Sequence, residues 1–176
     1  MHMSRFTKNT VLALGLMLLP TLACAAETAS GDLLGTDGAV HGHVQVTAAP
    51  KGVIVRVEAK GLTPGWHGIH FHEKGSCEAP KFTSAGGHVH TVKPVVHGLL
   101  NEKANDDGDL PNLYVASDGT ATVELYSTLV ALKGDAKRPN LLDADGASLV
   151  IHANPDDYTT QPIGGAGDRV ACAVLK

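Results

Sequence analysis

Short runs of apolar residues that alternate with polar ones are the feature that most constrains the fold of this 176-residue chain. Residues 40–46 read VHGHVQV and residues 52–62 read GVIVRVEAKGL, and in both segments valines recur at intervals of two. Successive side chains of a strand point to opposite faces, so this period indicates strands with one buried face. Beyond the N-terminal segment the chain shows no helical period.

Five further segments have the same character, and turn-forming residues separate them. They are GIHFH (68–72), DLPNLYV (109–115), TATVELY (120–126), ASLVIH (147–152) and DRVACAVL (168–175). APKG, TPG, SDG and DADG lie between the strands and are typical of tight turns. We therefore predict a single all-β domain over residues 26–176, an antiparallel sandwich or barrel.

Two connections, roughly residues 74–109 and 153–168, are longer than ordinary turns. Loops of more than about 15 residues in a compact domain are usually functional or disordered. The histidines described below favour function.

The N-terminus has the pattern of a secretory signal peptide over residues 1–25. Two basic residues precede the apolar run TVLALGLMLLPTLA, and small residues follow it up to Ala25, after which we expect cleavage. The run is shorter than the about 20 apolar residues of a membrane span. A lipoprotein with an acylated Cys24 is the alternative, although Thr21 stands where an aliphatic residue is expected. Either interpretation predicts export to the periplasm, with membrane attachment only if Cys24 is lipidated.

Export changes the charge and the cysteine count. Cleavage removes two basic residues and no acid, so the formal charge changes from −4 to −6, which argues against a nucleic-acid partner. It leaves Cys77 and Cys172 as the only cysteines. In an oxidising compartment this pair predicts a disulfide, with two free buried thiols as the alternative.

Three of the ten histidines lie on predicted strands in positions that packing does not explain. His70 and His72 are two residues apart, so both side chains leave the same face of their strand and can bind one ion. His152 closes the apolar strand ASLVIH. Neutral imidazole is the commonest metal ligand in proteins.

The stretch GGHVHTVKPVVHGLLNEKANDDGD (86–109) adds further donors. It contains His88, His90 and His97, and it ends in an acidic cluster that includes Asp106 and Asp109. Together with the strand histidines, this loop predicts a metal site.

Three histidines have simpler explanations. His41 and His43 alternate with the apolar face of their strand, so we expect both to be solvated, with a surface metal pair as the alternative. His67 follows Trp66 in what we predict is a tight turn, where a structural hydrogen-bonding role is expected.

The motifs GIHFHEKGSC, SAGGH, GDLPNLYV, LVIHANPDD and GGAGDRVAC resemble those of the copper,zinc superoxide dismutases of the bacterial periplasmic type. The resemblance runs from about residue 34 to the C-terminus. It implies an eight-stranded Greek-key β-barrel or sandwich with two long functional loops. It also implies conversion of two superoxide anions to oxygen and hydrogen peroxide by redox cycling of copper. Relatives of this type occur as monomers and as homodimers, and the sequence does not distinguish these states.

The resemblance also assigns roles to individual residues. His88 is implied to bridge copper and zinc and to pass a proton, and Arg169 to draw in and orient the anion. Asp156 is implied to link a copper histidine to a zinc histidine. The remaining implied positions are the copper ligands His70, His72 and His152, the zinc ligands His97 and Asp109, and the disulfide Cys77–Cys172.

The zinc loop departs from the family pattern. The family usually has a histidine three residues before Asp109, and this chain has Asp106 there. His90 stands where relatives usually have Asp or Asn. Asp106 as an oxygen ligand, His90 as a replacement nitrogen ligand, and weak or absent zinc binding are the three interpretations of this departure.

A second class of function follows from the same donors. A dismutase-like protein could store or buffer copper and zinc without turnover. The presence of Arg169 favours the enzyme, since a metal carrier does not need a residue that guides anions.

Overall fold

The computed structural model describes residues 26–176, and this part of the chain is almost entirely strand and loop. The predicted signal peptide lies outside the described residues. No helix of the described part is long and apolar enough to cross a membrane. The one helical turn is η1 (Thr83–Ala85). The strands are β1 (Thr28–Gly35), β2 (Val40–Ala49), β3 (Gly52–Ala59), β4 (Gly65–His67), β5 (Ile69–His72), β6 (Leu113–Val115), β7 (Ala121–Ser127), β8 (Ser148–His152) and β9 (Arg169–Val174).

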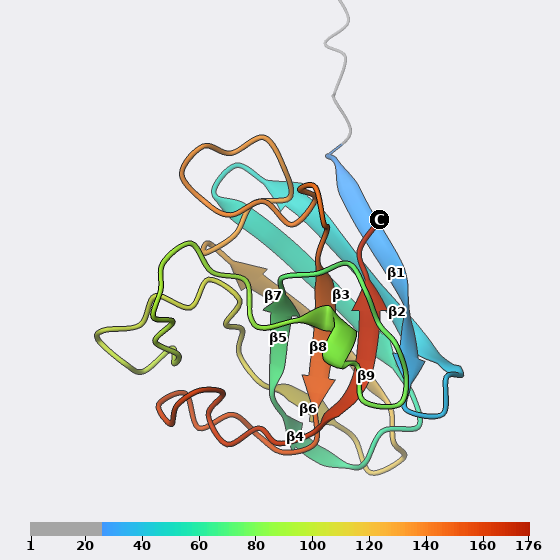
Figure 1. Ribbon diagram of the computed structural model, residues 1–176. Coiled ribbons are helices and arrows are strands. Elements are labelled where there is room, and N and C mark those ends of the chain that lie inside the picture. Colours follow the sequence, from blue (N-terminus) through green and yellow to red (C-terminus); the bar gives the residue numbers. More distant parts are fainter. Residues whose placement is uncertain (1–25) are drawn as a thin grey trace, which may run out of the picture.

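Seven strands form one antiparallel sheet in the order β5-β8-β9-β1-β2-β3-β7, and β4 pairs with β6 in a second sheet (Figure 1). β4 leads into β5 at one edge of the long sheet, and β6 leads into β7 at the other edge. Because β4 and β6 pair, they join these two edges and close the curled sheet. Neighbours that are distant in sequence, such as β9 and β1, are typical of Greek-key connections. The predicted all-β fold class is confirmed.

The described residues form nine strands where eight were expected, because residues 65–72 divide at Gly68. Before Gly68 the chain pairs with β6, and after it the chain pairs with β8. The Gly68 amide donates to Asn154 O at 2.8 Å, beyond the end of β8. The segment around Trp66 is therefore a short strand and not the predicted turn.

Alternation along the strands builds the core. On β3 the side chains of Val53, Val55 and Val57 are fully buried, whereas Ile54 between them is 41% exposed. Val44 and Val46 of β2 are fully buried in the same core cluster. Burial of a valine side chain contributes about 1.5 kcal/mol or more, so this stripe is a major source of stability.

β1 was not among the segments predicted from alternation. It contains Gly31 and Asp32, which are uncommon in strands, so the local signal is weak. The strand forms because it pairs with β2 along most of its length and with β9 at its end. Leu33 points into the core and is fully buried. A side chain at Gly31 would collide with the Val174 carbonyl, so the glycine permits the close approach of the C-terminal strand.

Three long connections leave the barrel, one more than predicted. The two expected loops lie between β5 and β6 and between β8 and β9, and they contact each other. The third spans residues 128–147, and buried Leu132 and Leu141 anchor it to the core. Asp135 accepts two hydrogen bonds from the Arg138 guanidinium within this loop, at 2.6 and 3.1 Å.

Truncation of Leu33 tests whether β1 is an integral part of the core. We expect Leu33→Ala to lower the free energy of unfolding by about 2–5 kcal/mol, because the substitution leaves a cavity at a fully buried position. Val40→Ala at the exposed start of β2 is the control and should change it by about 0.5 kcal/mol or less. Urea unfolding measures both, and equal effects would contradict the assignment of β1 to the core.

Candidate metal centre

Four buried histidines meet at one end of the barrel. β5 supplies His70 and His72, whose side chains share a face, the neighbouring strand β8 ends in His152, and the first long loop supplies His88. One ligand atom of each lies within 4.8 Å of those of the other three. The nitrogens His70 Nδ1, His72 Nε2, His88 Nε2 and His152 Nε2 are buried and have no hydrogen-bond partner. Buried polar atoms are rarely left unpaired, so this arrangement fits a metal ion.

The second nitrogen of each strand histidine is held by the protein. His72 Nδ1 donates to Gly86 O and His152 Nδ1 donates to Gly167 O, each at 3.0 Å. His70 Nε2 contacts an Asp156 carboxylate oxygen at 2.9 Å. These bonds orient the rings and leave the lone pair of the other nitrogen facing the shared point.

Burial keeps these rings neutral, as metal ligation requires. It lowers the pKa of His72 well below its usual value and the pKa of His152 to about 3. The nearby rings of His70 and His88 and the charge of Arg169 act in the same direction on His152. A neutral imidazole has a free lone pair at neutral pH, so no proton competes with an ion at these two ligands.

A second group of donors lies on the other side of His88. His88 Nδ1 is 2.7 Å from Asp106 Oδ2 and 3.7 Å from Asp109 Oδ1, and His97 Nδ1 is 3.4 Å and 2.7 Å from the same two oxygens. A tetrahedral Zn²⁺ with bonds of about 2.0 Å separates its ligand atoms by about 3.3 Å. The four distances, 2.7–3.7 Å, lie around this value. Among the described residues, the donor atoms here that all lie within 4.8 Å of one another belong to His70, His88, His97 and Asp109, and Asp106 is not a member of that group.

Each carboxylate of this group, like each strand histidine, uses one of its two polar atoms for a hydrogen bond to the protein. Asp106 Oδ1 accepts a hydrogen bond from the Gly108 amide at 3.1 Å, and Asp109 Oδ2 accepts one from the Gly98 amide at 2.8 Å. The other oxygen of each points to the histidines of the cluster: Asp106 Oδ2 lies 2.7 Å from His88 Nδ1, and Asp109 Oδ1 lies 2.7 Å from His97 Nδ1. His88 is the one side chain whose two nitrogens face both groups among the described residues.

In the second group, the carboxylates favour the protonated form of the histidines, and the histidines favour the ionised form of the carboxylates. Burial opposes charge on His97, but hydrogen bonds to Asp106, Asp109 and Asp156 outweigh it and raise the pKa of His97 to about 11. Burial likewise opposes ionisation of Asp106, yet its bonds to His88 and His97 lower its pKa. An ion that binds here must displace the protons that the histidines hold.

Asp156 joins the two groups. Its Oδ2 contacts His70 Nε2 at 2.9 Å and its Oδ1 contacts His97 Nε2 at 3.0 Å, and the carboxylate is buried. Asn112 Nδ2 donates to the Asp156 carbonyl at 2.8 Å and the Asp156 amide donates to Asn112 Oδ1 at 2.9 Å, which holds the residue in place. The geometry is that of a carboxylate between a ring of each group.

His90 turns away from both groups. Its Nδ1 donates to His88 O at 2.8 Å and lies 3.7 Å from Glu73 Oε2. Neither group of converging donors in the described part of the chain includes His90, and neither includes Asp106, but Asp106 Oδ2 lies 2.7 Å from His88 Nδ1 and 3.4 Å from His97 Nδ1. His90 lines the cavity beside the first group but does not share its centre.

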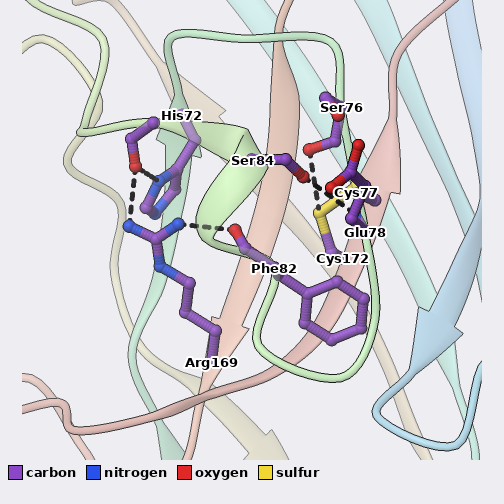
Figure 2. Close-up of a disulfide and its surroundings, with 9 residues drawn as sticks. His72, Ser76, Cys77, Glu78, Phe82, Ser84, Arg169 and Cys172 are labelled. Atoms are coloured by element: carbon purple, nitrogen blue, oxygen red, sulfur yellow. Dashed lines mark hydrogen bonds between the residues drawn. A yellow bond between two sulfur atoms is a disulfide. The ribbon is translucent and has the colours of Figure 1, made fainter.

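Arg169 lines the same cavity of about 310 Å³ as His72, His88 and His152. Its guanidinium donates to Phe82 O and to Gly86 O, each at 2.6 Å, and Gly86 O also accepts the bond from His72 (Figure 2). Burial lowers the pKa of Arg169, but a guanidinium stays charged in proteins. The side chain is thus a fixed positive group beside the first group of donors.

The loop that supplies these carbonyls is anchored to the last strand. Cys77 and Cys172 form the predicted disulfide, with Cα atoms 5.7 Å apart and a sequence separation of 95 (Figure 2). The bridge fixes the segment that carries Phe82 against β9, on which Arg169 also lies. The carbonyls of Phe82, Gly86 and Gly167 escaped sequence analysis, because a backbone acceptor has no side-chain signature.

The other histidines lie outside the two groups. His67 contacts His152 O at 2.6 Å and Thr63 O at 2.7 Å, which agrees with a structural role. His43 is exposed as expected, but His41 is not freely solvated, because its ring contacts Asp37 at 3.0 Å and Lys60 O at 3.1 Å.

Comparison with known families identifies the fold and the site together. Residues 40–175 match the family model for copper/zinc superoxide dismutase (SODC). The chain belongs to the copper/zinc superoxide dismutase family. Among its relatives, a superoxide dismutase [Cu-Zn] of Caulobacter vibrioides is 66% identical over 140 residues, 80% of each chain. Superoxide dismutase [Cu-Zn] 2 of Aquifex aeolicus is 38% identical and covers 94% of this chain and 96% of that one.

Solved structures of the family have the same architecture. A superoxide dismutase-like protein of Bacillus subtilis superposes with a TM-score of 0.76 at 36% identity, over 83% of this chain and 97% of that one. The Cu/Zn superoxide dismutase of Brucella abortus gives a TM-score of 0.68 at 29% identity, over 85% of this chain and 100% of that one. Membership of this family and the histidine-rich donor groups support binding of copper and zinc by this chain.

Replacement of Asp156 tests its place between the groups. Asp156→Asn keeps one oxygen and turns an amide NH₂ toward the other ring, so one histidine loses its acceptor. We expect the affinities for copper and for zinc to fall 10- to 100-fold, as for other outer partners of metal ligands. Competition with chelators measures both metal affinities. Asp118→Asn removes the same charge at an exposed turn and serves as the control. Unaltered affinities for both metals would contradict the linking role.

Proposed function

We propose that this chain is a superoxide dismutase that converts two superoxide anions and two protons to oxygen and hydrogen peroxide. The observation that carries the proposal is the convergence of four unpartnered imidazole nitrogens in a cavity that Arg169 also lines. Imidazole ligands suit copper. Copper, when bound, supplies the alternation between two oxidation states that takes an electron from one superoxide and gives it to the next.

The two groups of donors receive different metals in this proposal. Copper binds to His70, His72, His88 and His152, because these ligands are all imidazoles. Zinc would bind to His88, His97, Asp109 and Asp106, because zinc accepts a mixed set of nitrogen and oxygen ligands. His88 would contribute Nε2 to copper and Nδ1 to zinc. Its Nε2 faces the cavity and, when it is not a copper ligand, could hold a proton for the forming peroxide.

Asp106 is our choice for the fourth zinc ligand over His90. Asp106 Oδ2 lies 2.7 Å from His88 Nδ1 and 3.4 Å from His97 Nδ1. These two distances lie on either side of the about 3.3 Å that separates the ligand atoms of a tetrahedral zinc ion. His90 donates its Nδ1 proton to His88 O and faces Glu73. A side chain with this orientation would have to break its own hydrogen bond to ligate through Nδ1. Retained zinc binding is therefore better supported than a copper-only site.

Arg169 attracts and orients the anion. The protein as a whole is acidic, so superoxide must find a local positive potential. Charge focused in a cavity can raise association rates by about 10- to 1000-fold. The two carbonyls that bind the guanidinium hold this charge beside the copper histidines.

The proposal includes export. Residues 1–25 have the pattern of a signal peptide, and a disulfide between Cys77 and Cys172 suits an oxidising compartment. We propose that the mature protein begins after Ala25 and acts in the periplasm.

Dismutation by the mature chain, residues 26–176, tests the function. We expect the copper- and zinc-loaded protein to remove superoxide with a second-order rate constant near the diffusional limit of about 10⁹ M⁻¹s⁻¹. Arg169→Gln should retain copper but lose at least about tenfold in rate at low ionic strength. Pulse radiolysis measures both rates. Full metal loading without turnover would instead support a copper- and zinc-buffering protein.

Removal of the Asp106 carboxylate tests the zinc site. We expect Asp106→Ala to lower zinc affinity by at least about 100-fold, more than loss of an outer partner costs, because a ligand is lost. Asp106→His should keep zinc, since imidazole also suits it. His90→Ala is the matched control and should bind zinc as the native chain does. The opposite result, with zinc lost in His90→Ala and kept in Asp106→Ala, would reverse the assignment.

A further inference from the structure

The second group of donors belongs to a loop that has little regular structure of its own. His97 lies between Lys93 and Gly98 in a segment without strand or helix, yet the residue is fully buried. Its ring is held by Asp156, whereas its ligand distances also depend on where the backbone of residue 97 lies. Within the loop, Asn101 Nδ2 donates to the His97 carbonyl at 3.2 Å, whereas the His97 amide has its partner outside the loop.

Gln161, in the connection between β8 and β9, makes the required contacts. Its Oε1 accepts a hydrogen bond from the His97 amide at 2.9 Å, and its Nε2 donates to the His97 carbonyl at 2.8 Å. One primary amide thus satisfies both backbone groups of a single residue, as a neighbouring strand would. The same Nε2 donates to Thr159 O at 3.0 Å, which orients the amide.

The two loops also touch beside this pair. The Leu100 amide donates to Tyr158 O at 3.2 Å, and a side chain at Gly98 would collide with the same carbonyl. The Gly98 amide in turn donates to Asp109 Oδ2, and on the other side of His97 the Val96 amide donates to Asn105 Oδ1, so the chain on both sides of His97 is in contact with partners. Displacement of the backbone at His97 would therefore be transmitted to two zinc donors.

We propose that Gln161 is a positioning residue for the zinc site, which acts by holding the backbone of His97. Gln161 itself is exposed, so its own packing does not require an amide at this position. It contacts none of the rings assigned to copper. The inference rests on the proposed role of His97 as a zinc ligand.

Substitution by methionine separates this role from a general effect on the fold. Gln161→Met keeps the size of the side chain and removes both hydrogen bonds to His97. We expect zinc affinity, measured by competition with a chromophoric chelator, to fall about tenfold or more. Copper affinity and the thermal midpoint of the metal-free protein should match those of Gln45→Met, an exposed glutamine on β2. Gln161→Glu, which keeps only the acceptor, should lose less than Gln161→Met.

Three results would overturn the proposal in different ways. Zinc affinity of Gln161→Met within twofold of the native value would exclude the positioning role. An equal fall in zinc affinity, copper affinity and the midpoint of the metal-free protein would show a role in the fold alone. His97→Ala in the same assay distinguishes failure of the inference from failure of the proposed zinc site. If His97→Ala binds zinc as the native chain does, the site itself is wrongly assigned.

Discussion

The metal centre depends on a constraint that all of its buried donors but one obey. Every donor side chain has two polar atoms, and in all of them except His88 the protein binds one atom and leaves the other facing a shared point, whereas the two nitrogens of His88 face the two groups. Carbonyls hold His72 and His152, amides hold Asp106 and Asp109, and Asp156 holds a ring of each group. An unpaired buried polar group costs about 1–3 kcal/mol, so a bound ion relieves several such costs together. Metal binding and folding are therefore expected to be coupled.

The barrel and the loops contribute differently to this arrangement. Paired strands place His70, His72 and His152 on a rigid surface, where sites are held more precisely than on loops. The remaining donors lie on a long loop that needs external support. A disulfide, the arginine bonds to two carbonyls, and the contacts of Asp156 and Gln161 supply that support from β9 and from the connection before it.

Charge explains how an acidic chain can serve an anionic substrate. The carboxylates of Asp106, Asp109 and Asp156 are buried and are paired with histidines, so their charges are compensated within the site. Within residues 26–176, Arg169 has only backbone carbonyls as hydrogen-bond partners. Its positive charge is therefore not neutralised by a contacting acid and remains available in the cavity.

The sequence by itself determined the fold class, the cysteine pair and the candidate donors. Apolar residues at every second position predict strands such as β2 and β3. On β5 the two histidines His70 and His72 are two positions apart, so they lie on one face. These signals are local, because they depend only on the geometry of a single strand. Tertiary structure decided the rest: β1 and β4 form through their pairing partners, and the 128–147 loop is held by its buried leucines. It also directed Asp106, and not His90, toward the second group of donors. His70 and Asp156 are 86 residues apart, and only closure of the barrel and packing of the loops bring such residues together.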